Sequence, residues 1–355
     1  LTSKQLARKK GRKPALRQAV PRGPARCEIA VHARQGTFSL LAPHGVPILA
    51  KAWVEVELAD GDVLTTLQGG LAADAGFWAS PLANGRIVIE VTFERVTEPP
   101  AVIVAARVRN RGTEPLAVRA IRVARAVMGP APAAWGAPEA WRMLKLGYTF
   151  GAAHREDADG RNSGLVSFDR PSVTSRSFGM TALRLGAHGP GLILGFVAGE
   201  RQVAWIDVRK EGREIELAPC CDTEGTSIPP GEALAAERLY AGLHADPFAG
   251  LAAYAALCAR AAKVELKPVP RGWCSWYAYF AEATAEDVTR NAETCAALRA
   301  ELPLPVVQID AGWSRAMGDW LEPGARFPGG IEPVAARIKA LGLTPGIWVA
   351  PFAVE

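Results

Sequence analysis

Residues 271–352 contain three short apolar runs, and each has an aromatic or acidic residue within it or at its end. Trp276 lies in the first run, Asp310 ends the second and Trp348 lies in the third. The three runs occupy residues 272–280, 305–310 and 345–352. An aromatic ring can stack on the apolar face of a pyranose, and a carboxylate accepts hydrogen bonds from sugar hydroxyls. These residue types indicate a carbohydrate pocket.

Segments of helical periodicity separate the three runs and predict a βαβαβ arrangement with a parallel sheet. Thr284 is followed three positions later by Asp287, a capping-box pattern that predicts the start of a helix over residues 285–302. A second helix is predicted over residues 331–340. Ligands of such sheets bind beyond the carboxyl ends of the strands, which is where the aromatic and acidic residues are expected.

Five pieces of this part of the chain, in order, read GWCSWY, QIDAGW, GDW, RFP and PGIWVAPF. Together they resemble the start of the catalytic barrel of glycoside hydrolase family 36, the α-galactosidase and raffinose-synthase group. The resemblance implies a β-sandwich followed by a (β/α)8 TIM barrel. It also implies an α-galactosidase-like enzyme that acts on terminal α-linked galactose by retaining double displacement, with no metal or other cofactor.

The resemblance further implies roles for single residues. Family members hydrogen-bond galactose hydroxyls with two adjacent aspartates, of which this chain keeps Asp310 and replaces the second by Ala311. Trp348 stands where family members place a substrate-contacting tryptophan, and Trp276 is expected to stack on the sugar. Packing within the core is the alternative for both tryptophans. The loss of the second acid leaves the exact sugar and linkage open.

Asp319, in the GDW turn, and Trp313 are further candidate contacts, each with a structural role as the alternative. Trp141, Tyr148 and Phe150 lie where the N-terminal domain could send a loop over the barrel mouth.

Retaining glycosidases need two carboxylates about 5–5.5 Å apart, a nucleophile and an acid/base. In family 36 these lie on barrel strands four and six, whereas residues 268–355 supply strands one to three of a fold that takes about 250 residues. We therefore expect both catalytic residues beyond residue 355 and an inactive fragment here. The alternatives are a related α-glycoside specificity, transglycosylation of the raffinose-synthase type, or a non-catalytic carbohydrate-binding protein.

Residues 27–245 show many short alternating strands separated by turn residues, the pattern of a β-sandwich. Residues 101–127 and 191–208 are each predicted to form a hairpin. Residues 246–267 predict a linker helix, over 247–263, and a Pro-bearing connector into the barrel.

The net charge of +5 is unevenly distributed, because residues 1–26 contain nine Lys and Arg and no acid. We expect a disordered basic tail there, and the lack of interleaved aromatic residues argues against nucleic-acid binding. No apolar run is long enough for a membrane span. Six cysteines without metal-type spacing, and no signal sequence, favour a cytoplasmic protein without a metal. A homo-oligomer is expected for the full-length protein, with an α-galactoside or related oligosaccharide as its small-molecule partner.

Overall fold

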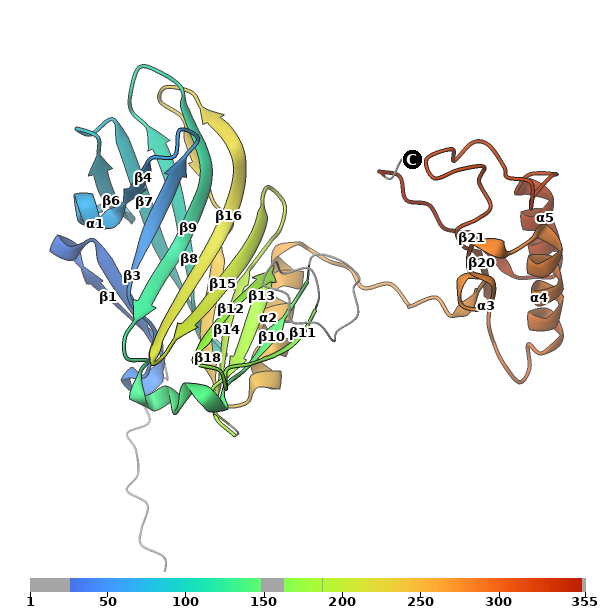
Figure 1. The fold of residues 1–355 in the computed structure, drawn as a ribbon, viewed down its shortest axis with the longest axis horizontal. Coiled ribbons are helices and arrows are strands. Elements are labelled where there is room, and N and C mark those ends of the chain that lie inside the picture. Colours follow the sequence, from blue (N-terminus) through green and yellow to red (C-terminus); the bar gives the residue numbers. More distant parts are fainter. Residues whose placement is uncertain (1–25, 148–162, 187, 353–355) are drawn as a thin grey trace, which may run out of the picture. The chain divides into compact units, whose positions relative to one another are not determined.

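The computed structural model describes residues 26–147, 163–186 and 188–352. They belong to two compact units that divide after Val264 (Figure 1). Apart from Arg26, the predicted basic tail lies outside the described residues.

The first unit is built almost entirely from two large sheets, whose strand pairings among the described residues are all antiparallel. The mostly antiparallel architecture predicted for residues 27–245 is thus confirmed. The first sheet consists, in spatial order, of β1 (Glu28–His32), β2 (Thr37–Leu41), β3 (Pro47–Leu58), β9 (Leu116–Met128), β16 (Glu214–Ile228), β15 (Val203–Glu211) and β12 (Ser172–Phe178), with β4 (Val63–Thr65) beside β3. The second consists of β11 (Gly164–Ser167), β10 (Arg142–Lys145), β13 (Met180–Arg184), β14 (Gly191–Phe196), β18 (Leu239–His244), β8 (Pro100–Asn110), β7 (Ile87–Thr97), β6 (Phe77–Leu82) and β5 (Ala72–Asp74), with β17 (Ala233–Ala235) beside β8.

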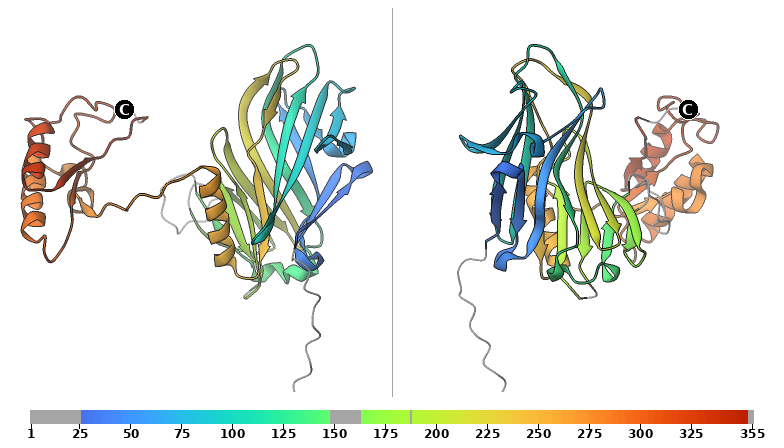
Figure 2. Two further views of the ribbon diagram at one scale, coloured as in Figure 1. Left: turned by 180° about the vertical axis from the view of Figure 1, so that it is seen from behind. Right: turned by 60° about the vertical axis from the view of Figure 1, so that its left-hand side comes forward.

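The two sheets lie face to face (Figure 2). Their inner faces share one apolar core. Alternation along β8 shows how the sequence produces it, since Val102 and Val104 enter this core while Ala101 and Ile103 face the other way. Short helical segments connect some strands, namely α1 (Thr66–Gly69), η1 (Ala33–Gln35), η2 (Pro43–Gly45), η3 (Ala133–Trp135) and η4 (Pro138–Ala140).

The helix predicted over residues 247–263 is α2 (Pro247–Ala261), which Asp246 caps by accepting a hydrogen bond from the Phe248 amide. The helix packs on the outer face of the second sheet, where Tyr254 donates a hydrogen bond of 2.6 Å to the carbonyl of Phe196. Across the described ranges, no helix has the length and apolar character needed to cross a membrane.

Both predicted hairpins are wrong. β8 and β9 follow one another in the sequence but lie in different sheets, and the same holds for β14 and β15. Each connection therefore passes from one layer to the other. Polar turn residues mark a reversal of the chain equally well in a hairpin and in such a crossing, and each of the four strands has buried residues along its length. The pattern could therefore not tell the two apart.

The second unit contains a three-stranded parallel sheet, β19 (Gly272–Cys274), β20 (Val306–Ile309) and β21 (Thr344–Ile347), in that spatial order. The chain between the strands forms α3 (Trp276–Tyr279), η5 (Phe280–Glu282), α4 (Ala285–Ala297) and α5 (Glu332–Ala340). Val307 and Ile309 of β20 pack with Val288 of α4 and Val334 of α5 in a second core. That these strands begin a (β/α)8 barrel stays a prediction.

Candidate functional site

Asp310 follows β20 directly, and residues of two neighbouring strand ends hold it. Its amide donates to the Ser275 hydroxyl at 2.9 Å, and Ser275 is completely buried just after β19. The Cys274 thiol and the Gln308 side-chain amide donate to Oδ2 at 3.2 and 2.8 Å. The β19–β20 register sets Cys274 opposite Gln308, which brings both side chains to one carboxylate.

The hydrogen bonds of Asp310 leave little of its accepting capacity unused. Two donors occupy Oδ2, and the amide of Ala311 donates to Oδ1 at 2.9 Å. An ionised carboxylate has about four acceptor positions, so about one remains, on Oδ1. Burial raises the pKa of the Cys274 thiol, and the neighbouring carboxylate raises it further, so the thiol stays protonated as a donor.

Cys274, Ser275 and Gln308 were not among the predicted site residues. They carried no motif signal of their own, because their role depends on which residues face one another across β19 and β20. A different register would have given Asp310 other partners.

Trp348 lies at the end of β21, beside the end of β20. Its amide donates to the carbonyl of Ile309 at 2.8 Å, and its carbonyl accepts a hydrogen bond of 3.0 Å from the Trp313 indole. Trp320 packs against both rings, with centroid distances of 5.9 Å to Trp313 and 6.0 Å to Trp348. Trp348 is half-buried, whereas Trp313 is only 4% exposed. The geometry of Trp313 therefore favours a positioning role, and its contact with a substrate stays a prediction.

Trp276 lies in the short helix α3 and not, as predicted, within the first strand. The strand ends at Cys274, two residues earlier. The Trp276 side chain is 36% exposed and packs edge-to-face against Phe280 at 5.4 Å. Because the adjacent Ser275 bonds to Asp310, the helix begins at the same edge of the sheet as the carboxylate.

Asp319 belongs to the loop between β20 and α5. Its carboxylate accepts hydrogen bonds from Arg315 at 2.8 and 2.9 Å, and Arg315 also pairs with Glu322. Ser314 and Pro323 form an isolated bridge that closes this loop. The contacts of Asp319 thus serve the loop itself, and its contact with a sugar stays a prediction.

Gly312 keeps this loop close to the neighbouring connection. Its φ is +102°, and a Cβ built there would lie 2.1 Å from the carbonyl oxygen of Ala281. Only glycine meets both conditions. The requirement fixes the path of the chain two residues after Asp310.

Trp141 does not reach outward from the first unit, because it is fully buried and donates to the Trp135 carbonyl at 2.9 Å. Tyr148 and Phe150 lie outside the described residues. Within the ranges that the structure describes, no three His, Cys, Asp or Glu side chains are placed to bind a metal.

Comparison with known proteins bears on this arrangement. No family model matches the chain. The α-galactosidase AgaA of Geobacillus stearothermophilus is 32% identical over 84 residues, which is 22% of this chain and 11% of that protein. The solved α-galactosidase from Lactobacillus brevis matches 96% of this chain and 49% of its own, with a TM-score of 0.56 and 11% identity. A variant of AgaA in complex with raffinose matches 85% and 46%, with a TM-score of 0.51 and 15% identity.

The resemblance to glycoside hydrolase family 36 is confirmed. At such low identity the solved structures establish the fold alone, which this chain shares over nearly its whole length. The chain spans about half the length of these solved relatives.

Proposed function

We propose that this chain forms the sugar-recognition edge of an α-galactosidase-like glycoside hydrolase. The observation that carries the proposal is Asp310, a carboxylate fixed at the end of β20 with about one acceptor position unused, beside half-buried and exposed tryptophans. This combination suits a pyranose, which offers hydroxyl donors and an apolar face. The α-galactosidase names of the relatives agree with it.

Each residue at this edge has a distinct part in the proposal. A hydroxyl of the terminal sugar donates to Oδ1 of Asp310, and the exposed surfaces of Trp276 and Trp348 contact the apolar face of the ring. Trp313 supports Trp348 through its indole hydrogen bond. Asp319 maintains the shape of the loop through Arg315.

The chemistry of the proposed reaction is retaining double displacement, which needs a nucleophile and an acid/base about 5–5.5 Å apart. Asp310 and Asp319 both form structural hydrogen bonds, and neither is proposed as the nucleophile or the acid/base. We propose that further barrel strands in the full-length protein supply the catalytic pair. On that basis the chain alone does not turn over α-galactosides.

One feature supports a second candidate within the same class. Ala311 offers a methyl group where the family pattern has a second carboxylate, and its amide occupies one acceptor position of Asp310. One anchor for a sugar hydroxyl is therefore absent. A related α-glycoside specificity, or transfer to a sugar acceptor as in raffinose synthases, is the alternative to hydrolysis of galactosides.

The test uses the full-length parent protein with an aryl α-galactoside, and NMR to determine the anomer released first. The expected result is turnover with retention, and Asp310→Asn should lower kcat/KM at least about tenfold, because hydrogen bonds to charged groups contribute about 1.5–3 kcal/mol. Asp169→Asn, at an exposed position of the first unit, is the matched control. A folded parent without galactosidase activity, or one unaffected by Asp310→Asn, would contradict the proposal. Better activity on another α-glycoside would favour the alternative.

A further inference from the structure

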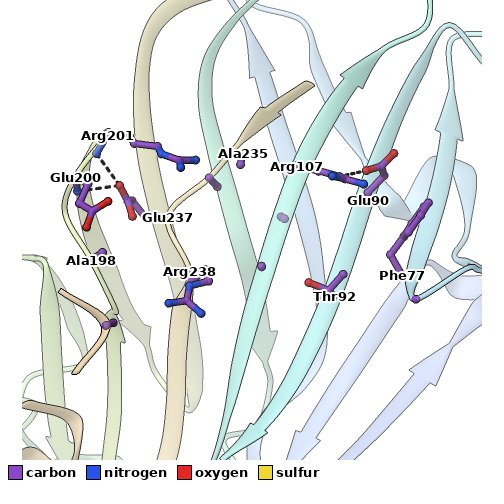
Figure 3. Close-up of a pocket in the computed structure, with 15 residues that line it drawn as sticks. Phe77, Glu90, Thr92, Arg107, Ala198, Glu200, Arg201, Ala235, Glu237 and Arg238 are labelled. Carbon is purple, nitrogen blue, oxygen red and sulfur yellow. Dashed lines mark hydrogen bonds and ion pairs between the residues drawn. The ribbon is translucent and has the colours of Figure 1, made fainter. Parts of the chain in front are cut away.

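A cavity of about 580 Å³ opens on the outer face of the second sheet, opposite the core that the two sheets share (Figure 3). Its residues come from β6, β7 and β8, from the β14–β15 connection, from the segment around β17, and from the end of α2. All belong to the first unit, and none takes part in the edge around Asp310. The cavity has the size usual for a small-molecule site, about 300–1,000 Å³.

The cavity floor is lined by small side chains. Alternation along β8 turns Val104 and Val108 to the core and leaves Ala105 on the outer face. Ala198 and Ala235 line the same cavity. With only methyl groups projecting, the floor is a shallow apolar surface on which a ring can lie.

Charged and aromatic groups gather at one end of the floor, where Glu90 is only 2% exposed. Its carboxylate accepts hydrogen bonds from the Nε atoms of Arg107 and Arg109, the latter at 2.8 Å. The Arg107 guanidinium also lies over the Phe77 ring, 5.7 Å from its centroid. Among the described residues, the terminal nitrogens of Arg107 and the hydroxyl of Thr92 form no hydrogen bond, so both remain available.

The opposite end of the floor is organised by Glu237, which is 7% exposed (Figure 3). One carboxylate oxygen accepts hydrogen bonds from the amides of Glu200 and Arg201 at 3.1 and 2.8 Å. The other oxygen has no partner within the described ranges, and the same is true of the Arg201 guanidinium. In the part of the chain that the structure describes, the Arg238 side chain has one ion pair, at 3.7 Å from Glu94. This end thus offers both acceptors and donors.

The charges of the lining decide the class of ligand. Three arginines and three glutamates line the cavity, so their formal charges cancel. A site for phosphate or another anion would carry an excess of positive charge, whereas hydroxyl groups can both donate to carboxylates and accept from guanidinium groups. We propose that this cavity binds a neutral oligosaccharide, with hydroxyls paired to Glu237 and Arg201 at one end and to Arg107 at the other.

The proposal is tested by hydrogen–deuterium exchange of the complete chain with raffinose titrated into the millimolar range. Raffinose should slow exchange in peptides that cover residues 198–203 and 233–238. In Arg201→Ala, the raffinose concentration needed for half of the maximal protection should rise at least about tenfold. The reason is that a hydrogen bond to a charged group contributes about 1.5–3 kcal/mol. Arg184→Ala is the matched control, because Arg184 is an exposed arginine of the same sheet that does not line the cavity. It should leave the protection unchanged.

A second variant distinguishes recognition of the sugar from a change in the fold. Glu237→Gln keeps a side-chain oxygen to accept from the Arg201 amide but replaces the unpaired oxygen by a donor, so protection should fall while the unliganded exchange pattern stays the same. Asp310→Asn should not alter protection here, so the result does not depend on the sugar contact proposed for Asp310. The inference is overturned if raffinose protects neither segment, if Arg201→Ala and Glu237→Gln leave protection intact, or if inorganic phosphate protects these segments and raffinose does not.

Discussion

Ser275→Ala should destabilise the second unit by removing the hydroxyl that joins the end of β19 to Asp310. Ser275 is fully buried, and its oxygen is the acceptor for the Asp310 amide at 2.9 Å. Within the described residues no other acceptor serves that amide. This hydrogen bond is partly buried, and a hydrogen bond contributes about 0.5–1.5 kcal/mol net, so the expected loss in the free energy of unfolding is about 1 kcal/mol.

Urea unfolding followed by tryptophan fluorescence measures this loss, with Ser227→Ala, at an exposed position of β16, as the control. A second measurement is the rate at which Cys274 reacts with a thiol reagent, located by peptide mapping. That rate should rise, because the substitution loosens the strand end where the Cys274 thiol bonds to Asp310. A loss no larger than that of Ser227→Ala, together with an unchanged rate at Cys274, would refute the idea that this hydrogen bond fixes the carboxylate.

Four further outcomes follow from the second unit. Thr284→Ala, which removes the N-cap of α4, should lower the free energy of unfolding by about 1 kcal/mol in thermal or urea unfolding, and an unchanged midpoint would contradict the cap's role. Hydrogen bonds from Thr284 lower the pKa of Asp287 below its ordinary value of 3.8. The contribution of ionised Asp287 to the free energy of unfolding should therefore be complete above pH 3.8 and be lost as the pH falls through the lower folded-state pKa. Asp287→Asn should weaken this pH dependence of stability. Gly312→Ala should destabilise more than Gly179→Ala, because both have positive φ but only the former meets a neighbouring carbonyl oxygen; equal losses would show that backbone strain alone matters. In the full-length parent, Ala311→Asp should raise kcat/KM on galactosides, and no gain together with better activity on another glycoside would indicate a different specificity.

Local patterns in the sequence predicted several elements well because their causes are local. The capping box at Thr284 and Asp287 is present at the start of α4 as predicted, with the Asp287 amide donating to the threonine hydroxyl at 3.1 Å. The parallel pairing of β19, β20 and β21 also agrees with the predicted βαβαβ order. Each of these features depends on residues only a few positions apart, or on the alternation of strand and helix.

The features that the sequence did not predict depend on contacts between distant segments. The run at residues 272–280 is mostly apolar and aromatic, so its pattern could not show that β19 stops at Cys274 and that Trp276 begins a helix. Likewise, nothing in the turn after β8 indicates that β9 joins the other sheet. Tertiary packing decides both cases, and the pairing of distant segments cannot be read from a single sequence.

The accepting capacity of Asp310 sets how far this edge can distinguish one sugar from another. Three donors within the chain already bond to the carboxylate, and about one acceptor position remains for a hydroxyl. A single hydrogen bond to a charged group contributes about 1.5–3 kcal/mol, which corresponds to roughly 10- to 150-fold discrimination against a sugar that cannot donate it. Because Ala311 adds no second anchor, stricter selection has to come from the shape of the surfaces around Trp276 and Trp348. Substituting either tryptophan should therefore change the preference between epimers, and not only the affinity for all of them.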